Sequence, residues 1–124
     1  MTVATWKELP DELGVDELVS RGEEWGELRV RYIEFPAGVD VTPMMQGLPG
    51  DLCTCPHWGY VLEGSIHLRY ADGTDEVTKA GDLYYWPAPH TAWTEEPVKF
   101  IEFSPAEEMA RVLAHVKAKL AAGS

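Results

Sequence analysis

The feature that most constrains this chain is a series of short extended segments, separated by turn residues, between residues 27 and 103. Leu28, Val30 and Tyr32 alternate with Arg29, Arg31 and Ile33, which is typical of a half-buried strand. Asp72-Gly73 predicts a tight hairpin, because both residue types accept the backbone of such turns. Turns recur about every 8–12 residues, which indicates an all-β sandwich or barrel. The predicted strands are 28–33, 39–46, 53–63, 65–70, 76–79, 83–86, 92–95 and 98–103.

The two ends of the chain depart from this pattern. Ser104-Pro-Ala-Glu107 is typical of a helix-capping box with proline at the first helical position. Apolar residues then follow at helical spacing, so we expect an amphipathic helix over about 105–121 that packs on the barrel. Residues 1–26 predict an irregular lead-in, with a short helix near 16–20 as an alternative. We therefore expect one domain over 1–124, with a barrel core over about 28–103.

Charge excludes several classes of partner. The chain has 21 acidic and 10 basic residues, a net charge of −11, and its few basic positions are scattered. Such a surface repels phosphate backbones and anionic lipids, so neither a nucleic acid nor a membrane is an expected partner. No apolar run approaches the ~20 residues of a membrane span, and residues 1–9 do not resemble a signal peptide. We expect a cytoplasmic protein whose two cysteines are thiols or metal ligands.

Two segments carry a family resemblance. Residues Cys53–Gly64 read Cys-Thr-Cys-Pro-His-Trp-Gly-Tyr-Val-Leu-Glu-Gly, and residues 81–87 read Gly-Asp-Leu-Tyr-Tyr-Trp-Pro. Together they resemble the two motifs of the cupin superfamily, and the resemblance covers about residues 28–103. It implies an all-β jelly-roll barrel (the RmlC-like fold), frequently dimeric, that holds a divalent metal among inward side chains.

The sequence departs from the family pattern at the metal positions. The family's glutamate position falls on His57, and its first two histidine positions fall on Asp51 and Cys53. Its last histidine would fall on Ala92, whereas this chain has His90 two residues earlier. The chain resembles a separate branch with a Cys-x-Cys-Pro-His-Trp-Gly signature, for which the family alone implies no reaction.

The same segment supplies a candidate metal site. Residues two apart in a strand face the same side, so Cys53, Cys55 and His57 are expected to share one face, with His90 arriving from a later loop. Sulfur and imidazole donors favour zinc, and they suit copper and then iron less well. Four bound ligands would make a structural site, and three would leave a position for water or substrate. A buried cysteine can also be a simple core residue, and His57 a hydrogen-bonded core histidine.

Three functions remain open from the sequence. The first is a metal-dependent lyase, isomerase or hydrolase for a small organic molecule, in which His90 or Tyr84 moves a proton. The second is a non-catalytic module that binds or senses a small molecule or metal as a homodimer. The third is a structural homodimer whose thiols sense oxidation or metal. Aromatic residues near both motifs are expected to fill the core, a dimer interface or a ligand pocket.

Overall fold

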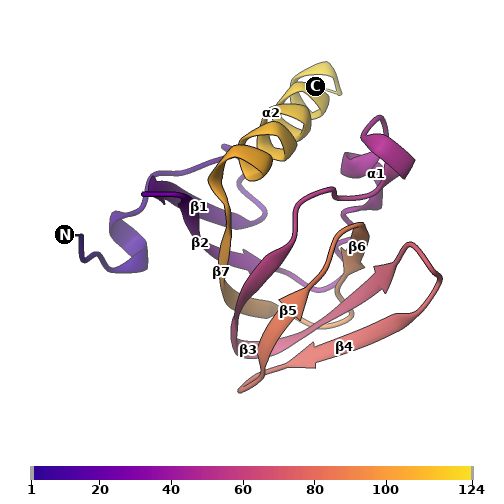
Figure 1. Cartoon of the computed structure of the whole chain (residues 1–124). Coiled ribbons are helices and arrows are strands. Elements are labelled where there is room, and N and C mark those ends of the chain that lie inside the picture. The colour runs from indigo at the N-terminus through magenta and orange to yellow at the C-terminus, as the bar shows by residue number, and fades with distance from the viewer. Residues whose placement is uncertain (1, 124) are drawn as a thin grey trace.

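The computed structural model describes residues 2–123 and shows a mostly antiparallel β-structure with a C-terminal helix (Figure 1). Seven strands and two α-helices follow each other along these residues. They are β1 (Val19–Trp25), β2 (Leu28–Phe35), α1 (Thr42–Met45), β3 (His57–Tyr70), β4 (Asp75–Lys79), β5 (Leu83–Trp86), β6 (His90–Trp93), β7 (Val98–Pro105) and α2 (Ala106–Ala122). Two short 3-10 turns, Trp6–Glu8 and Pro49–Asp51, complete the path. None of the helices in residues 2–123 has the length and apolar character to cross a bilayer.

The long strand β3 joins two sheets into the barrel. Its first half pairs with β7 and β5, and its second half pairs with β4 and β6, always antiparallel. The pairing register with β7 shifts between Val61 and Glu63, and the pairing with β7 ends at Gly64. Gly64 has a φ of 77°, and a Cβ there would lie 1.8 Å from the Pro97 carbonyl oxygen. Only glycine fits this position, because any side chain would clash with backbone.

The barrel core is formed by alternating residues of these strands. In β3, Ile66 and Leu68 are buried between the sheets, as the alternation predicts, and the hairpin at Asp72-Gly73 is also present. In β2, however, the buried positions run from Arg31 to Ile33, and Arg31 and Ile33 line the interior. The reason lies outside β2, since Tyr32 on the opposite side is covered by Trp6, whose ring stacks on it at 4.2 Å between centroids.

The N-terminal segment is more ordered than expected. Residues 19–25 form β1, which pairs with β2 along its whole length, instead of an irregular lead-in or a short helix. Glu12, just before this strand, is buried and bound to Arg29 and Arg31 of β2. A buried carboxylate with two arginine partners therefore ties the beginning of the described chain to the barrel.

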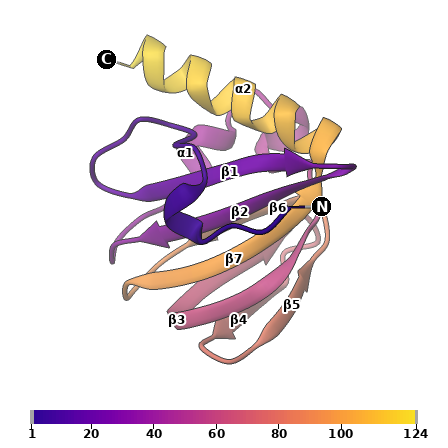
Figure 2. The same cartoon turned by 90° about the vertical axis from the view of Figure 1, so that its left-hand side faces the viewer.

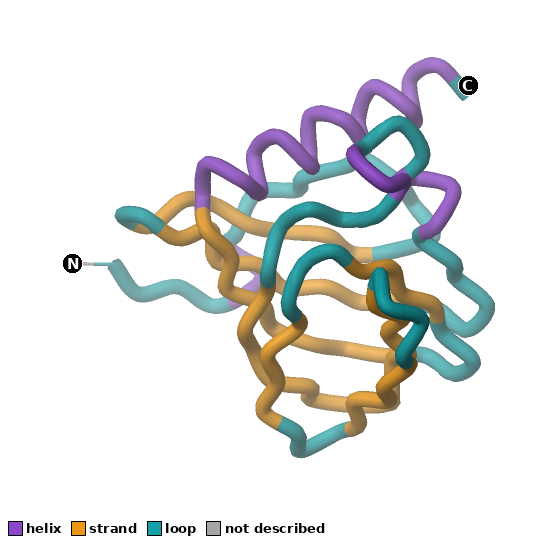
Figure 3. The backbone as a smooth tube through the Cα atoms, turned by 45° about the vertical axis from the view of Figure 1, so that its right-hand side comes forward, coloured by secondary structure: helices purple, strands orange, loops and turns teal. Residues whose placement is uncertain are grey.

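Helix α2 covers one side of the barrel, as predicted (Figure 2). Its buried residues pack against α1 and the segment before β3, forming a second apolar cluster. Figure 3 shows the backbone of α2 passing beside α1. The predicted capping box is wrong: Ser104 belongs to β7, and no side chain caps the helix, which follows Pro105 directly. The Ser104 hydroxyl instead points into the barrel, where it meets His57. The cluster contains Met45, Cys53, Cys55, Met109, Val112, Leu113 and Val116.

Candidate metal centre

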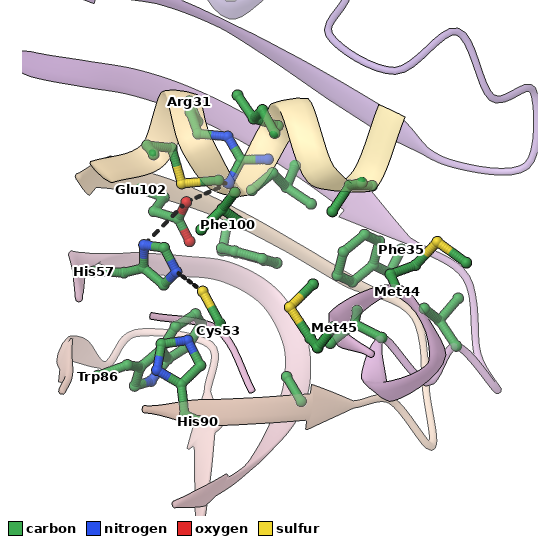
Figure 4. Close-up of a pocket in the computed structure, with 18 of the residues that line it drawn as sticks. Arg31, Phe35, Met44, Met45, Cys53, His57, Trp86, His90, Phe100 and Glu102 are labelled. Atoms are coloured by element: carbon green, nitrogen blue, oxygen red, sulfur yellow. Dashed lines mark hydrogen bonds and ion pairs between the residues drawn. The ribbon is translucent and has the colours of Figure 1, made fainter. Parts of the chain in front are cut away.

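Three side chains that could hold a metal ion converge inside the barrel. One donor atom each from Cys53, His57 and His90 lies within 4.8 Å of the other two, and all three residues are buried (Figure 4). His57 and His90 are the first residues of β3 and β6. Cys53 precedes β3 and is held beside His90 by two backbone hydrogen bonds, of 2.7 and 3.2 Å. The first residues of two strands and one isolated β-bridge thus position the three donors.

Both histidines are oriented through the ring nitrogen Nδ1. The His90 Nδ1–H donates to the carbonyl oxygen of Pro87 at 2.9 Å. The His57 Nδ1 lies 2.7 Å from the Ser104 Oγ, and the Ser104 hydroxyl donates to Glu102 at 3.3 Å. Because the Ser104 hydroxyl donates its hydrogen to Glu102, it acts as the acceptor toward His57, and the His57 Nδ1–H is the donor. Each ring therefore turns its Nε2 toward the cluster, where the Nε2 of His57 lies 3.6 Å from the Cys53 Sγ, and this is the orientation in which histidine binds metals in proteins.

A buried network of charged side chains lies next to the Nδ1 side of His57. Glu102 is 2 % exposed, lies 3.5 Å from His57 Nδ1 and forms a short ion pair with Arg31. Arg31 also binds Glu12 at 2.9 Å, so the positive charge is shared by two carboxylates. Burial opposes the ionised form of Glu102, but His57 and Arg31 outweigh it and lower its pKa. No buried side-chain nitrogen or oxygen in residues 2–123 lacks a hydrogen-bond partner.

Burial also sets the protonation of the three donors. It lowers the pKa of His57 to about 4 and lowers the pKa of His90, so both imidazoles are neutral at pH 7. Burial raises the pKa of the Cys53 thiol to about 11, so this thiol keeps its proton in the absence of a metal. The two imidazoles are ready to bind a cation, whereas Cys53 has to release one proton when a metal binds.

The cluster opens into an apolar cavity of about 180 Å³. Figure 4 shows the three donors at one end, Arg31 and Glu102 along one side, and Phe35, Met44 and Met45 at the other end. Three protein donors beside a cavity leave room for a further ligand. The remaining lining residues are Leu13, Leu18, Ile33, Val39, Asp40, Val41, Leu68, Trp86, Ala92, Phe100, Met109, Val112, Leu113 and Val116.

Cys55 does not join the other three donors. It is fully buried, but its Sγ contacts the Pro56 carbonyl at 3.4 Å and packs in the cluster beneath α2. The predicted strand over 53–63 begins only at His57, so the alternation that would align Cys53 and Cys55 with it does not apply. Both cysteines are free thiols.

Tyr84 lies in the core, away from the cavity lining. Its hydroxyl donates to the Ile101 carbonyl at 2.8 Å, and its ring stacks on Trp86 at 3.7 Å between centroids. Burial raises the pKa of this phenol, which keeps it protonated. The role in proton transfer expected for Tyr84 has no support from this position.

Asp51 and His67 lie outside the donor cluster. Asp51 belongs to a turn, where its carboxylate accepts the Gly47 N–H at 2.9 Å. His67 stacks on Trp93 at 5.1 Å between centroids and lies 3.6 Å from Glu95. Neither residue lines the cavity.

Three residues near the site were not identified from the sequence: Arg31, Glu102 and Ser104. A signal was present for two of them, because Val98 and Phe100 set an alternation that places residues 102 and 104 on the same inward face. A glutamate at such a position is rarely buried unless it is paired. Arg31 gave no such signal, since arginines in strands commonly face solvent.

Comparison with known proteins gives a fold and no closer relationship. No protein-family model and no curated protein matches the sequence. Ectoine synthase from P. lautus has a TM-score of 0.61 at 13% identity, over 85% of this chain and 78% of that chain. An RmlC-like cupin from Shewanella frigidimarina has a TM-score of 0.57 at 20% identity, over 82% and 87%. The polyketide cyclase RemF from Streptomyces resistomycificus also has a TM-score of 0.57 at 20% identity, over 85% and 79%.

These identities are low, so the likeness concerns the arrangement of the strands. That arrangement agrees with the seven antiparallel strands and the packed C-terminal helix. The chain therefore has the jelly-roll fold of the RmlC-like cupins, with a buried Cys53–His57–His90 group that could hold a metal ion.

Proposed function

We propose that Cys53, His57 and His90 bind one zinc ion, and that the protein acts on a small organic molecule in the adjoining cavity. The observation that carries this proposal is the convergence of three buried donor atoms within 4.8 Å of one another. One thiolate and two neutral imidazoles suit zinc, with copper and iron as weaker alternatives. The oriented Nδ1 atoms and the low pKa of His57 favour the same assignment.

Three protein ligands are characteristic of catalytic rather than structural zinc. A zinc ion bound there would supply Lewis acidity toward a carbonyl group or a water molecule. The chain's own residues would do the rest: Ser104 and Glu102 hold His57 in place, Pro87 holds His90, and the apolar walls exclude bulk water. Lyase, isomerase and hydrolase reactions fit these properties. Ectoine synthase and a polyketide cyclase share the fold, which supports small-molecule chemistry as a class.

Metal analysis tests the first half of the proposal. We expect the protein, purified without a histidine tag, to contain about one zinc per chain by plasma mass spectrometry. Cys53→Ser and His57→Ala should lose this zinc, because each removes one of three ligands. His67→Ala is the matched control and should retain it, since His67 lies outside the cavity. Wild-type protein that holds no metal even after reconstitution would refute the proposal.

A non-catalytic module that binds or senses a metal or small molecule as a homodimer is the second candidate. It is favoured by the charges beside the metal donors, because Arg31 and Glu102 neutralise each other there and Tyr84 does not line the cavity. Turnover of candidate substrates by the zinc-loaded protein would decide against it. The expected dimer stays a prediction, and light scattering checks it.

A further inference from the structure

The cavity beside the metal donors has an apolar body and one polar end. Phe35, Met44 and Met45 form the end away from the donors, and Phe100 lies between the two ends (Figure 4). The methionine side chains are flexible and adapt to irregular apolar shapes. Most of a bound molecule would therefore contact hydrocarbon, sulfur and aromatic rings.

The charged groups of the wall leave no cation available for a bound anion. Arg31 uses its Nε on Glu12, one terminal nitrogen on Glu102 and the other on the Ser20 hydroxyl at 3.2 Å. The other charged lining residues within 2–123 that are not metal donors are Glu102 and Asp40, both acidic. In the metal-free protein, an anion in the cavity would be desolvated next to carboxylates without gaining a counter-charge, which is strongly unfavourable.

The volume sets the size of the occupant. A cavity of about 180 Å³ is slightly larger than the roughly 150 Å³ apolar cavity that is known to accept benzene. It admits one aromatic ring or a short branched chain with a small head group. It is too small for a nucleotide or a sugar phosphate.

We infer that the cavity binds an uncharged, mainly apolar molecule of about this size, whose single electron-pair donor group points toward Cys53, His57 and His90. The orientation of the head group rests on the proposed zinc site, whereas the preference for an uncharged apolar body rests on the cavity wall alone. A change from hydroxymethyl to carboxylate on the same ring is therefore the sharpest discriminator.

Ligand titration followed by NMR tests the uncharged body in the metal-free protein. Benzyl alcohol should bind and shift amide signals of residues that line the cavity, and benzoate should bind about tenfold or more weakly. Met44→Trp should weaken benzyl alcohol binding about tenfold by filling the apolar end. Leu83→Trp is the matched control, because Leu83 is 84% exposed and outside the lining, and it should bind like wild type. Benzoate binding as tightly as benzyl alcohol, or no effect of Met44→Trp, would overturn the inference.

A second titration tests the orientation. Benzyl mercaptan, which is uncharged when free, should bind zinc-loaded protein about tenfold more tightly than metal-free protein, because its sulfur becomes a good zinc ligand when it releases its proton to solvent. Equal affinities in a sample shown to contain zinc would overturn the orientation. Failure to load zinc would instead count against the proposed function, and the metal-free titration would still decide the preference for an uncharged body.

Discussion

Replacing Ser104 by alanine should weaken metal binding although Ser104 cannot touch the metal. Its hydroxyl accepts a hydrogen bond from the Nδ1–H of His57 at 2.7 Å and donates one to Glu102 at 3.3 Å. Without it, His57 loses the partner that fixes its ring orientation and its tautomer. Partners of this kind typically contribute 10- to 100-fold to metal affinity, which corresponds to about 1.4–2.7 kcal/mol.

The assay is a competition for zinc between the protein and a chelator of known affinity, at constant pH. Ser104→Ala should still bind one zinc, with a dissociation constant raised by about 10- to 100-fold. The unfolding free energy of the metal-free variant is measured in parallel, because a buried Nδ1–H without a partner costs about 1–3 kcal/mol. Ser65→Ala is the control, since Ser65 lies in the same barrel, pairs with Lys79 and has no part in the site. A folded Ser104→Ala protein with unchanged zinc affinity would refute this reasoning.

Three further predictions concern the surroundings of the site. Cys55→Ala should keep one zinc per chain and lose only about 1 kcal/mol of unfolding free energy, because Cys55 fills space beneath α2. Metal analysis checks the zinc content and urea unfolding checks the stability. Loss of zinc would show that Cys55 is a ligand. For Glu12, burial raises the pKa, but Arg31 and the hydrogen bonds from Ser20, Arg29 and Arg31 outweigh burial, so the folded-state pKa lies below its ordinary value of 4.5. Its contribution is therefore present above about pH 4.5 and is lost as the pH falls through the depressed pKa. Glu12→Gln should lower the free energy of unfolding by about 3 kcal/mol at pH 7 and reduce its difference between pH 7 and pH 3. Both are measured in EDTA, with Glu96→Gln at an exposed position as the control. An unchanged pH dependence would contradict the role of Glu12. Gly59→Ala should destabilise the barrel by several kcal/mol, because its Cβ would lie 2.0 Å from the Ile101 carbonyl oxygen, and a thermal melt like that of wild type would show that β3 and β7 can move apart.

The general architecture could be predicted because its signals are local. The turn at Asp72-Gly73, the alternation in β3 and the helical spacing after residue 105 each depend on neighbours in sequence, and each is present in the structure. The cupin-like motif placed these strands in a barrel, and the shared fold confirms that placement. The strand β1 was not predicted, because its polar, glycine-containing sequence forms a strand only by pairing with β2.

The site was predicted only in part, because residue types can be recognised in the sequence but their positions depend on the local path of the chain. Cys53, His57 and His90 were recognised as donors by residue type, and the barrel brings them together. Cys55 was expected beside them because a continuous strand was assumed, whereas the chain before His57 is irregular and turns this thiol toward α2.

The sequence by itself determined the class of fold, the position of the final helix, and the residue types from which a soft metal site can be built. Only the tertiary structure decided which donors meet, that Ser104 orients His57 instead of capping α2, and that Arg31 and Glu102 lie inside the barrel. The physical reason is the range of the interactions. Turns and periodicity act over a few residues, but Arg31 and Glu102 are 71 residues apart, and their burial is favourable only once β2 and β7 are paired and each charge has its partner.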